Sequence, residues 1–142
     1  MKKLITPRLA AFGTAAILSS VLVFHGLILT GIIPYAITWG GRLKSYEQMV
    51  QFETVSIVIN LMMLAVILIK AGWLKISMKP VIINAALWMM GGLFVMNTVG
   101  NMFAVSLLER WIATPLTALL ALFSLRLAMA RADEMGLRPV VG

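Results

Sequence analysis

Six polar side chains stand out in this chain of 142 residues because most of the sequence around them is apolar. Glu53 and His25 carry ionisable groups, and Asn97 and Asn101 carry amides, inside segments that are otherwise hydrocarbon. Polar groups in such surroundings normally face the inside of a helix bundle or water rather than lipid. Together they could recognise a small polar or cationic solute. The candidate ligand-binding residues are Glu53, Asn97, Asn101, His25, Asn60 and Arg42.

The spacing of these residues predicts that they occupy two helix faces. Tyr46, Glu53 and Asn60 recur every seven residues, which places them on one stripe of a helix. Asn97 and Asn101 are four residues apart and share a face of a later helix. A short loop favours pairing of the two helices that it joins. We therefore expect the stripe to turn Glu53 toward both amides, at the centre of a polar cluster.

Each candidate also has a purely structural interpretation, which the sequence leaves open. Glu53 could form a salt bridge at the lipid headgroup boundary instead of binding a ligand. The basic candidates for that bridge are Arg42, Lys44 and Arg110. His25 could hydrogen-bond a neighbouring helix rather than carry a proton or bind a metal. The two amides could join helices, at about 0.6–2 kcal/mol each.

The composition indicates which environment must hold these residues. The chain is 61% hydrophobic and 12% charged, whereas about a quarter of the residues in soluble domains are charged. A bilayer can solvate so many apolar side chains, so we expect a membrane protein. The net charge of +7 flanks the apolar runs rather than forming a basic face, which argues against a nucleic-acid partner. The absence of cysteine excludes disulfides and thiolate metal sites.

The apolar runs predict an all-α integral membrane protein with four transmembrane helices in one antiparallel bundle, a single domain over 1–142. A span needs about 20 residues. The first run is too long for a secretory signal, whose apolar core is normally about 7–15 residues, so we expect it to be retained. The predicted helices cover residues 9–33, 46–69, 80–103 and 107–130.

Local signals set most of these boundaries. Pro34 should close the first helix, because the residue before a proline is disfavoured in the α conformation. Ser45 and Gln48 form a capping-box pattern at the start of the second helix. Pro80 suits the first turn of the third helix, where its missing N–H costs nothing.

The fourth helix has two possible starts. Ser106 and Glu109 form a second capping-box pattern, which predicts a helix from about residue 107. Pro115 would then lie inside that helix, where it should kink the backbone and free the carbonyl of Trp111. Alternatively, Thr114 caps a shorter helix that begins at Pro115. We favour the longer, kinked helix.

The distribution of lysine and arginine predicts the orientation, because cytoplasmic segments carry the excess. Only Arg42, Lys44 and Arg110 lie in the first and third loops. The tails and the second loop hold nine of the twelve basic residues: Lys2, Lys3, Arg8, Lys70, Lys75, Lys79, Arg126, Arg131 and Arg138. Both termini are therefore expected in the cytoplasm, with the protein in the plasma (inner) membrane and the polar cluster in its outer half.

The fourth helix carries small side chains at spacings of three and four residues, which let helix backbones approach each other in a bilayer. They are Thr114, Thr117, Ala121, Ser124 and Ala128. We expect this stripe to pack inside the bundle or against another subunit. Arg126, near the far end of the same helix, could extend its side chain to the interface.

Two classes of function follow from this architecture. The first is binding or translocation of a small polar or cationic solute through an outward-facing polar vestibule. The second is a structural or accessory subunit that contacts copies of itself or another membrane protein and has no ligand. An enzyme is a third reading, since Glu53 and His25 could supply acid–base chemistry, but no nucleophile or metal motif accompanies them. No cofactor or metal is expected.

Overall fold

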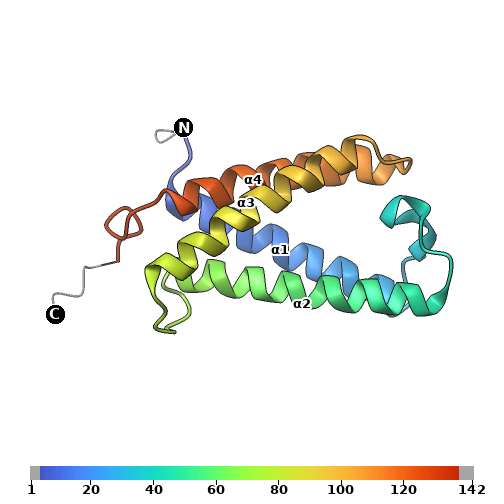
Figure 1. Ribbon diagram of the computed structural model, residues 1–142, viewed down its shortest axis with the longest axis horizontal. Helices are drawn as coiled ribbons and strands as arrows, with labels where there is room; N and C mark the ends of the chain where they lie inside the picture. The colour runs from blue at the N-terminus through green and yellow to red at the C-terminus, as the bar shows by residue number, and fades with distance from the viewer. Residues whose placement is uncertain (1–3, 138–142) are drawn as a thin grey trace.

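The computed structural model describes residues 4–137, and within that range the chain is all-helical, with no β-strand (Figure 1). The long helices are α1 (Pro7–Leu29), α2 (Tyr46–Lys70), α3 (Pro80–Met102) and α4 (Thr114–Ala128). Short 3₁₀ turns η1 (Tyr35–Ile37) and η2 (Trp39–Gly41) follow α1, and a π-helix, η3 (Glu109–Ala113), leads into α4. Taken with η3, the described chain has four helices long and apolar enough to cross a membrane, which confirms the predicted helical class.

The first helix begins at Pro7, two residues before the predicted start at residue 9, and it also ends early. The Thr6 hydroxyl accepts a hydrogen bond from the Leu9 N–H, and Pro7 occupies the first turn. The helix ends at Leu29, four residues before the predicted end at residue 33. The chain leaves it through Gly31, whose φ of +80° few other residues adopt at low cost. Pro34 therefore follows the helix end and does not cause it.

The starts of α2 and α3 confirm the local signals. The Ser45 hydroxyl accepts from the Gln48 N–H at 3.2 Å, and the Gln48 side chain accepts in return from the Lys44 N–H at 3.1 Å. Pro80 is in the first turn of α3, after Lys79. Each signal depends only on residues within one turn, so nothing distant in the chain competes with it.

The second capping-box pattern predicts the start of the helix correctly, at Leu107, but its side-chain hydrogen bonds do not form. The Ser106 hydroxyl donates to the carbonyl oxygen of Ile37 at 3.1 Å instead of capping the helix. The Glu109 carboxylate accepts from the N–H of Gly40 at 2.8 Å. Both side chains reach the loop that joins α1 to α2, 69 residues away along the chain. Ser106 and Glu109 therefore bond to residues far away in the sequence, and not to the neighbouring N–H groups that a capping box would use.

Helical conformation starts at Leu107 and continues through η3 into α4, so the helix does not begin at Pro115. Because proline has no N–H, Pro115 cannot donate a hydrogen bond to the carbonyl of Trp111, four residues earlier. The wider π turn lies directly before it, and the N–H of Thr114 bonds to the carbonyl of Glu109, five residues back. Such π turns are rare and occur mostly as single turns inside α-helices, as here.

The helices pack as two hairpins that meet at one end. Helix α1 packs along α2 and α3 along α4, while α1 also contacts α4. Figure 1 shows the two pairs diverging toward the end that holds η1 and η2. Helices α2 and α3 make few contacts, so the expected pairing that would have turned Glu53 toward Asn97 and Asn101 is wrong.

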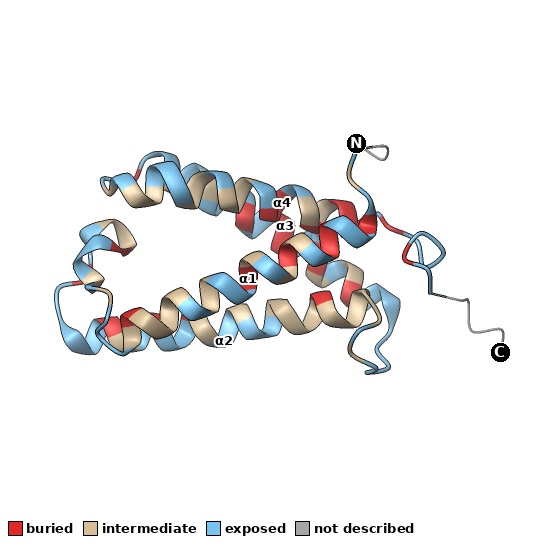
Figure 2. Ribbon diagram, turned by 180° about the vertical axis from the view of Figure 1, so that it is seen from behind, coloured by how far each residue is buried: buried red, intermediate tan, exposed pale blue. Residues whose placement is uncertain are grey.

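The main core fills the end where the hairpins meet, which we call the closed end; Figure 2 shows the buried residues concentrated there. Its central members include Ala10, Leu18, Leu87, Ala121 and Leu127. A smaller cluster of Ile28, Leu43 and Met49 lies beside the η1–η2 loop.

Small residues explain why α4 approaches its neighbours so closely. A Cβ added at Gly91 of α3 would lie 2.7 Å from a methyl carbon of Leu125. From the predicted small-residue stripe, Ala121, Ser124 and Ala128 are buried, as expected for packing inside the molecule. The Thr117 hydroxyl lies 2.9 Å from that of Thr98 on α3.

Two cations tie the closed end together. The Arg126 side chain is 2% exposed, donating to the Ile5 carbonyl and the Glu134 carboxylate, so the expected extension to an interface is wrong. The Lys70 ammonium donates to the Asn84 side chain and to the carbonyl of Ala130, two residues after the end of α4. These bonds hold the N-terminal segment, α2, α3 and the C-terminal segment at one end.

Candidate functional site

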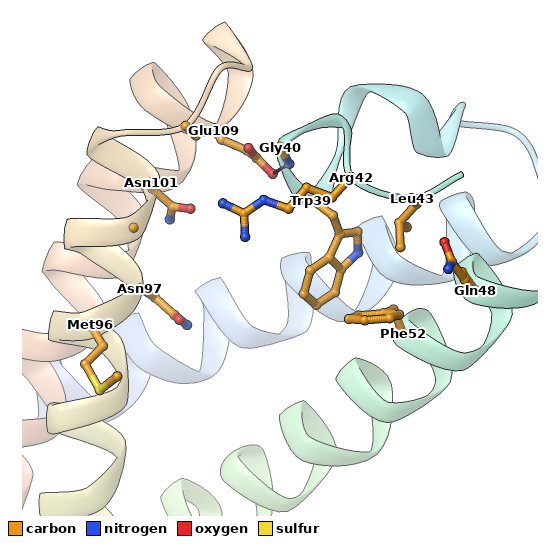
Figure 3. A pocket seen from close by; sticks show the side chains of 12 residues that line it. Trp39, Gly40, Arg42, Leu43, Gln48, Phe52, Met96, Asn97, Asn101 and Glu109 are labelled. Atoms are coloured by element: carbon orange, nitrogen blue, oxygen red, sulfur yellow. Dashed lines mark hydrogen bonds between the residues drawn. The ribbon is translucent and has the colours of Figure 1, made fainter. Parts of the chain in front are cut away.

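A cavity of about 490 Å³ lies at the open end, between the two hairpins and under the η1–η2 loop (Figure 3). We call it the vestibule. Among the residues that line it are Trp39 and Arg42 from the loop, Phe52 from α2, Asn97 and Asn101 from α3, and Glu109 from η3. Three of the six sequence-predicted candidates, Arg42, Asn97 and Asn101, are therefore brought together.

The loop wall of the vestibule has an unusual backbone. Trp39, Gly40 and Gly41 have φ values of +54°, +64° and +70° in succession. For a tryptophan this conformation costs about 1–3 kcal/mol and persists only where surrounding contacts enforce it. The Trp39 indole supplies such contacts. Its N–H donates to Glu53 at 2.8 Å, and its ring packs edge-on against Phe52 with centroids 5.1 Å apart.

Glu53 and His25 form a closed cluster behind Trp39 instead of lining the vestibule. The Glu53 side chain is fully buried. One carboxylate oxygen accepts from the Trp39 indole, and the other lies 2.5 Å from Nδ1 of His25 on α1. The structure thus pairs Glu53 with His25 and Trp39, in place of the loop arginines and lysine that the sequence suggested. Both carboxylate oxygens are occupied by groups of the protein itself.

Arg42 is the positive charge of the vestibule. Its side chain extends from the loop toward the α3 amides, with the guanidinium near Asn101 in Figure 3. The residue is exposed. Within residues 4–137 its side chain makes no hydrogen bond or ion pair, so the five N–H donors of the guanidinium remain available.

The two α3 amides face the same space from the opposite hairpin. Asn101 is half-buried and Asn97 exposed, and neither side chain hydrogen-bonds to another residue in the described chain. They therefore do not act as the inter-helix links that a structural interpretation requires. Asn60 differs, because its amide donates to the Ser56 carbonyl on its own helix at 2.8 Å and does not line the vestibule.

The candidates taken from the sequence did not include three residues that line the vestibule, namely Trp39, Phe52 and Glu109. Glu109 was read as a helix cap, and nothing local shows that its partner is Gly40. The available signal was the run of two glycines after Trp39. It marks a backbone that other segments can approach closely.

Three kinds of comparison, with models of protein families, with curated proteins and with solved structures, find no match to this chain.

Proposed function

We propose that this chain is an integral membrane protein with both termini in the cytoplasm and a vestibule on the outer face that binds a small polar solute. Membrane insertion is supported by the exposed surface. Only 17% of the apolar stretch in α1, and the same share in α2, is buried within the molecule. The remaining apolar side chains need a hydrocarbon solvent, which a bilayer provides.

The orientation is supported by the charges at the two ends. Gly72 in the second loop lies against Leu137, and Ile5 bonds to Arg126, so the described ends and that loop share the closed end. The basic residues described at this end are Arg8, Lys70, Lys75, Lys79, Arg126 and Arg131. The vestibule lies at the opposite end, which is the outer side if the basic end is cytoplasmic.

One observation supports solute binding: the vestibule contains polar side chains that have no hydrogen-bond partner within the described residues 4–137. Arg42, Asn97 and Asn101 supply a guanidinium and two amides to a cavity with an aromatic wall. A few polar groups converging on a largely apolar pocket are typical of small-molecule sites, and a volume of about 300–1,000 Å³ is usual for them. The solute enters from the outer face and is held between the two hairpins.

The structural-subunit function has its own support, from the cluster of His25, Glu53 and Trp39. Within residues 4–137, the side-chain bonds of that cluster all join its own members, as expected for groups that only lock helices together. In this alternative the exposed apolar faces contact a second copy or another membrane protein. Changes in the vestibule would then leave the protein's role intact.

Thermal melting in detergent tests the proposal. Purified protein is heated with a panel of amino acids, amines, organic acids and phosphates, because a ligand that binds only the folded state stabilises it by mass action. We expect at least one solute to raise the melting temperature of the natural chain. The double variant Asn97→Ala/Asn101→Ala should lose this shift, and Asn60→Ala, the matched amide outside the vestibule, should keep it. A shift that survives the double variant would refute binding in the vestibule.

A further inference from the structure

Two opposite charges flank Gly40 at the vestibule without forming an ion pair with each other. A Cβ built on Gly40 would lie 3.5 Å from Nε of Arg42 and 3.7 Å from a carboxylate oxygen of Glu109. Such a Cβ would be in ordinary van der Waals contact with both groups, so a cation and an anion both lie beside Gly40.

Glu109 is positioned to present part of its charge to the vestibule. One carboxylate oxygen, Oε1, accepts from the Gly40 N–H at 2.8 Å, which fixes the orientation of the group. The other, Oε2, has no hydrogen bond within residues 4–137. The Glu109 carboxylate is half-buried and lines the vestibule, so its Oε2 can accept a hydrogen bond from a ligand there.

Apolar side chains complete the vestibule on both sides. Trp39 and Phe52 form an aromatic wall on the first hairpin, and Met96 lies opposite them on α3. Phe52 and Met96 are 45% and 70% exposed, so the vestibule continues into the apolar outer surface of both hairpins. A ligand with a hydrocarbon part could extend along that surface while its polar part stays between the charges.

We propose that the vestibule recognises a zwitterion, namely a molecule in which a protonated amine, with N–H donors, and a phosphate or carboxylate lie a few bonds apart. This proposal rests on the proposed solute-binding function and names its ligand class. The anionic group pairs with the Arg42 guanidinium, whose planar fork suits two-point contact with phosphate or carboxylate. The ammonium pairs with Oε2 of Glu109 and meets the Trp39 face, which attracts cations.

Charge balance excludes simpler ligands as good fits. A ligand with only a negative charge would be attracted by Arg42 but repelled by the Glu109 carboxylate. A ligand with only a positive charge would be attracted by Glu109 but repelled by Arg42. A zwitterion neutralises both groups and leaves no charge unpaired, the condition under which burial of charges is tolerated. The phosphoethanolamine head group of an outer-leaflet lipid and a free aminoalkyl phosphate share this chemistry.

The test measures affinity by thermal melting in detergent with four probes. They are phosphatidylethanolamine, phosphatidylglycerol, phosphatidylcholine and soluble glycerophosphoethanolamine. We expect the ethanolamine probes to bind the natural chain at least tenfold more tightly than phosphatidylglycerol, which lacks the ammonium, and than phosphatidylcholine, whose ammonium has no N–H. Equal affinity for the two ethanolamine probes identifies a free solute as the source, and tighter binding of the lipid identifies the membrane.

Two variants test the contributions of the two charges one at a time. Arg42→Gln should weaken all phosphate-bearing probes by tenfold or more. Glu109→Gln keeps an acceptor for the Gly40 N–H but removes the charge, so it should weaken only the ethanolamine probes and abolish their preference over phosphatidylglycerol. Lys44→Gln, on the same loop but outside the vestibule lining, serves as the control and should change nothing.

The inference is overturned if the natural chain binds phosphatidylglycerol as well as phosphatidylethanolamine, or if Glu109→Gln keeps the preference. It also fails if no zwitterion binds while another solute from the wider panel stabilises the chain through Asn97 and Asn101. In that case the vestibule still binds a solute, and only the ligand class is wrong. Failure of the whole solute panel would remove the proposed function as well.

Discussion

His25 on α1 and Glu53 on α2 are joined through their side chains, with Nδ1 of the imidazole 2.5 Å from a carboxylate oxygen. The second oxygen holds Trp39, and so this pair anchors the η1–η2 loop to the first hairpin. Glu109 and Ser106 bind the same loop from the second hairpin, through Gly40 and Ile37. The loop therefore bridges two hairpins that otherwise diverge at this end.

Removing the Glu53 carboxylate should destabilise this end of the protein strongly. Glu53→Ala leaves the Trp39 N–H and the His25 ring without their partner, and breaking a buried pair from one side costs about 3–5 kcal/mol. Glu53→Gln keeps an acceptor for Trp39 and a polar group near His25, so we expect a loss of about 1 kcal/mol. Detergent melts measure both losses. Equal melting temperatures for the two variants would contradict the cluster.

The same pair of variants distinguishes a scaffold from a site. Glu53 lies behind Trp39, so Glu53→Gln should retain most of the solute binding in the vestibule. Binding that disappears although the melting temperature is kept would show that the Glu53 charge acts on the ligand directly.

Adjacent glycines on α3 should respond in opposite directions to alanine. A methyl group at Gly91 would meet the Leu125 side chain at 2.7 Å, and overpacking costs about 1–3 kcal/mol. A methyl group at Gly92 would meet nothing within 4 Å, and alanine favours the helix by about 0.5–1 kcal/mol. Gly91→Ala should therefore melt earlier than the natural chain, and Gly92→Ala at the same temperature or later. If Gly92→Ala melted earlier than Gly91→Ala, α3 would have to be rotated about its own axis relative to this structure.

Ser124 offers a test of the α4 packing. Its hydroxyl is buried and has no hydrogen-bond partner in the described part of the chain, so Ser124→Ala should be neutral or stabilising, because an unsatisfied buried polar group is removed. Ser124→Leu fills the same position with a larger side chain and should destabilise by about 1–3 kcal/mol. Unfolding in detergent compares the two. A leucine tolerated as well as alanine would mean that this face of α4 contacts lipid.

The natural absence of cysteine makes the orientation easy to test. Lys44→Cys places one thiol on the loop between α1 and α2, which we propose to lie outside, and Ser77→Cys places one on the loop between α2 and α3; both positions are exposed. A membrane-impermeant maleimide added to intact cells should label the first variant only, because positive loops stay in the cytoplasm. Lysis should expose the second. Labelling of Ser77→Cys in intact cells would invert the proposed orientation.

The positions of the long helices could be read from the sequence because they depend on local properties. The length of an apolar run limits the length of a span, and the Ser45 cap and Pro80 act on neighbouring N–H groups. The three-and-four spacing of small residues likewise indicated which face of α4 is buried, since the helical period alone determines that face.

Which side chains from distant segments contact each other could be seen only in the tertiary structure. Glu109 matches a helix cap in sequence, yet it binds Gly40, because the folded loop presents an N–H to it at 2.8 Å. The stripe on α2 indicated that Glu53 faces inward but not what it meets. Because α2 and α3 make few contacts, Asn97 and Asn101 do not meet Glu53. His25 and Trp39 contact its carboxylate instead. Helix periodicity specifies a direction from one axis, whereas a partner depends on how several axes pack, and side chains far apart in the chain decide that packing.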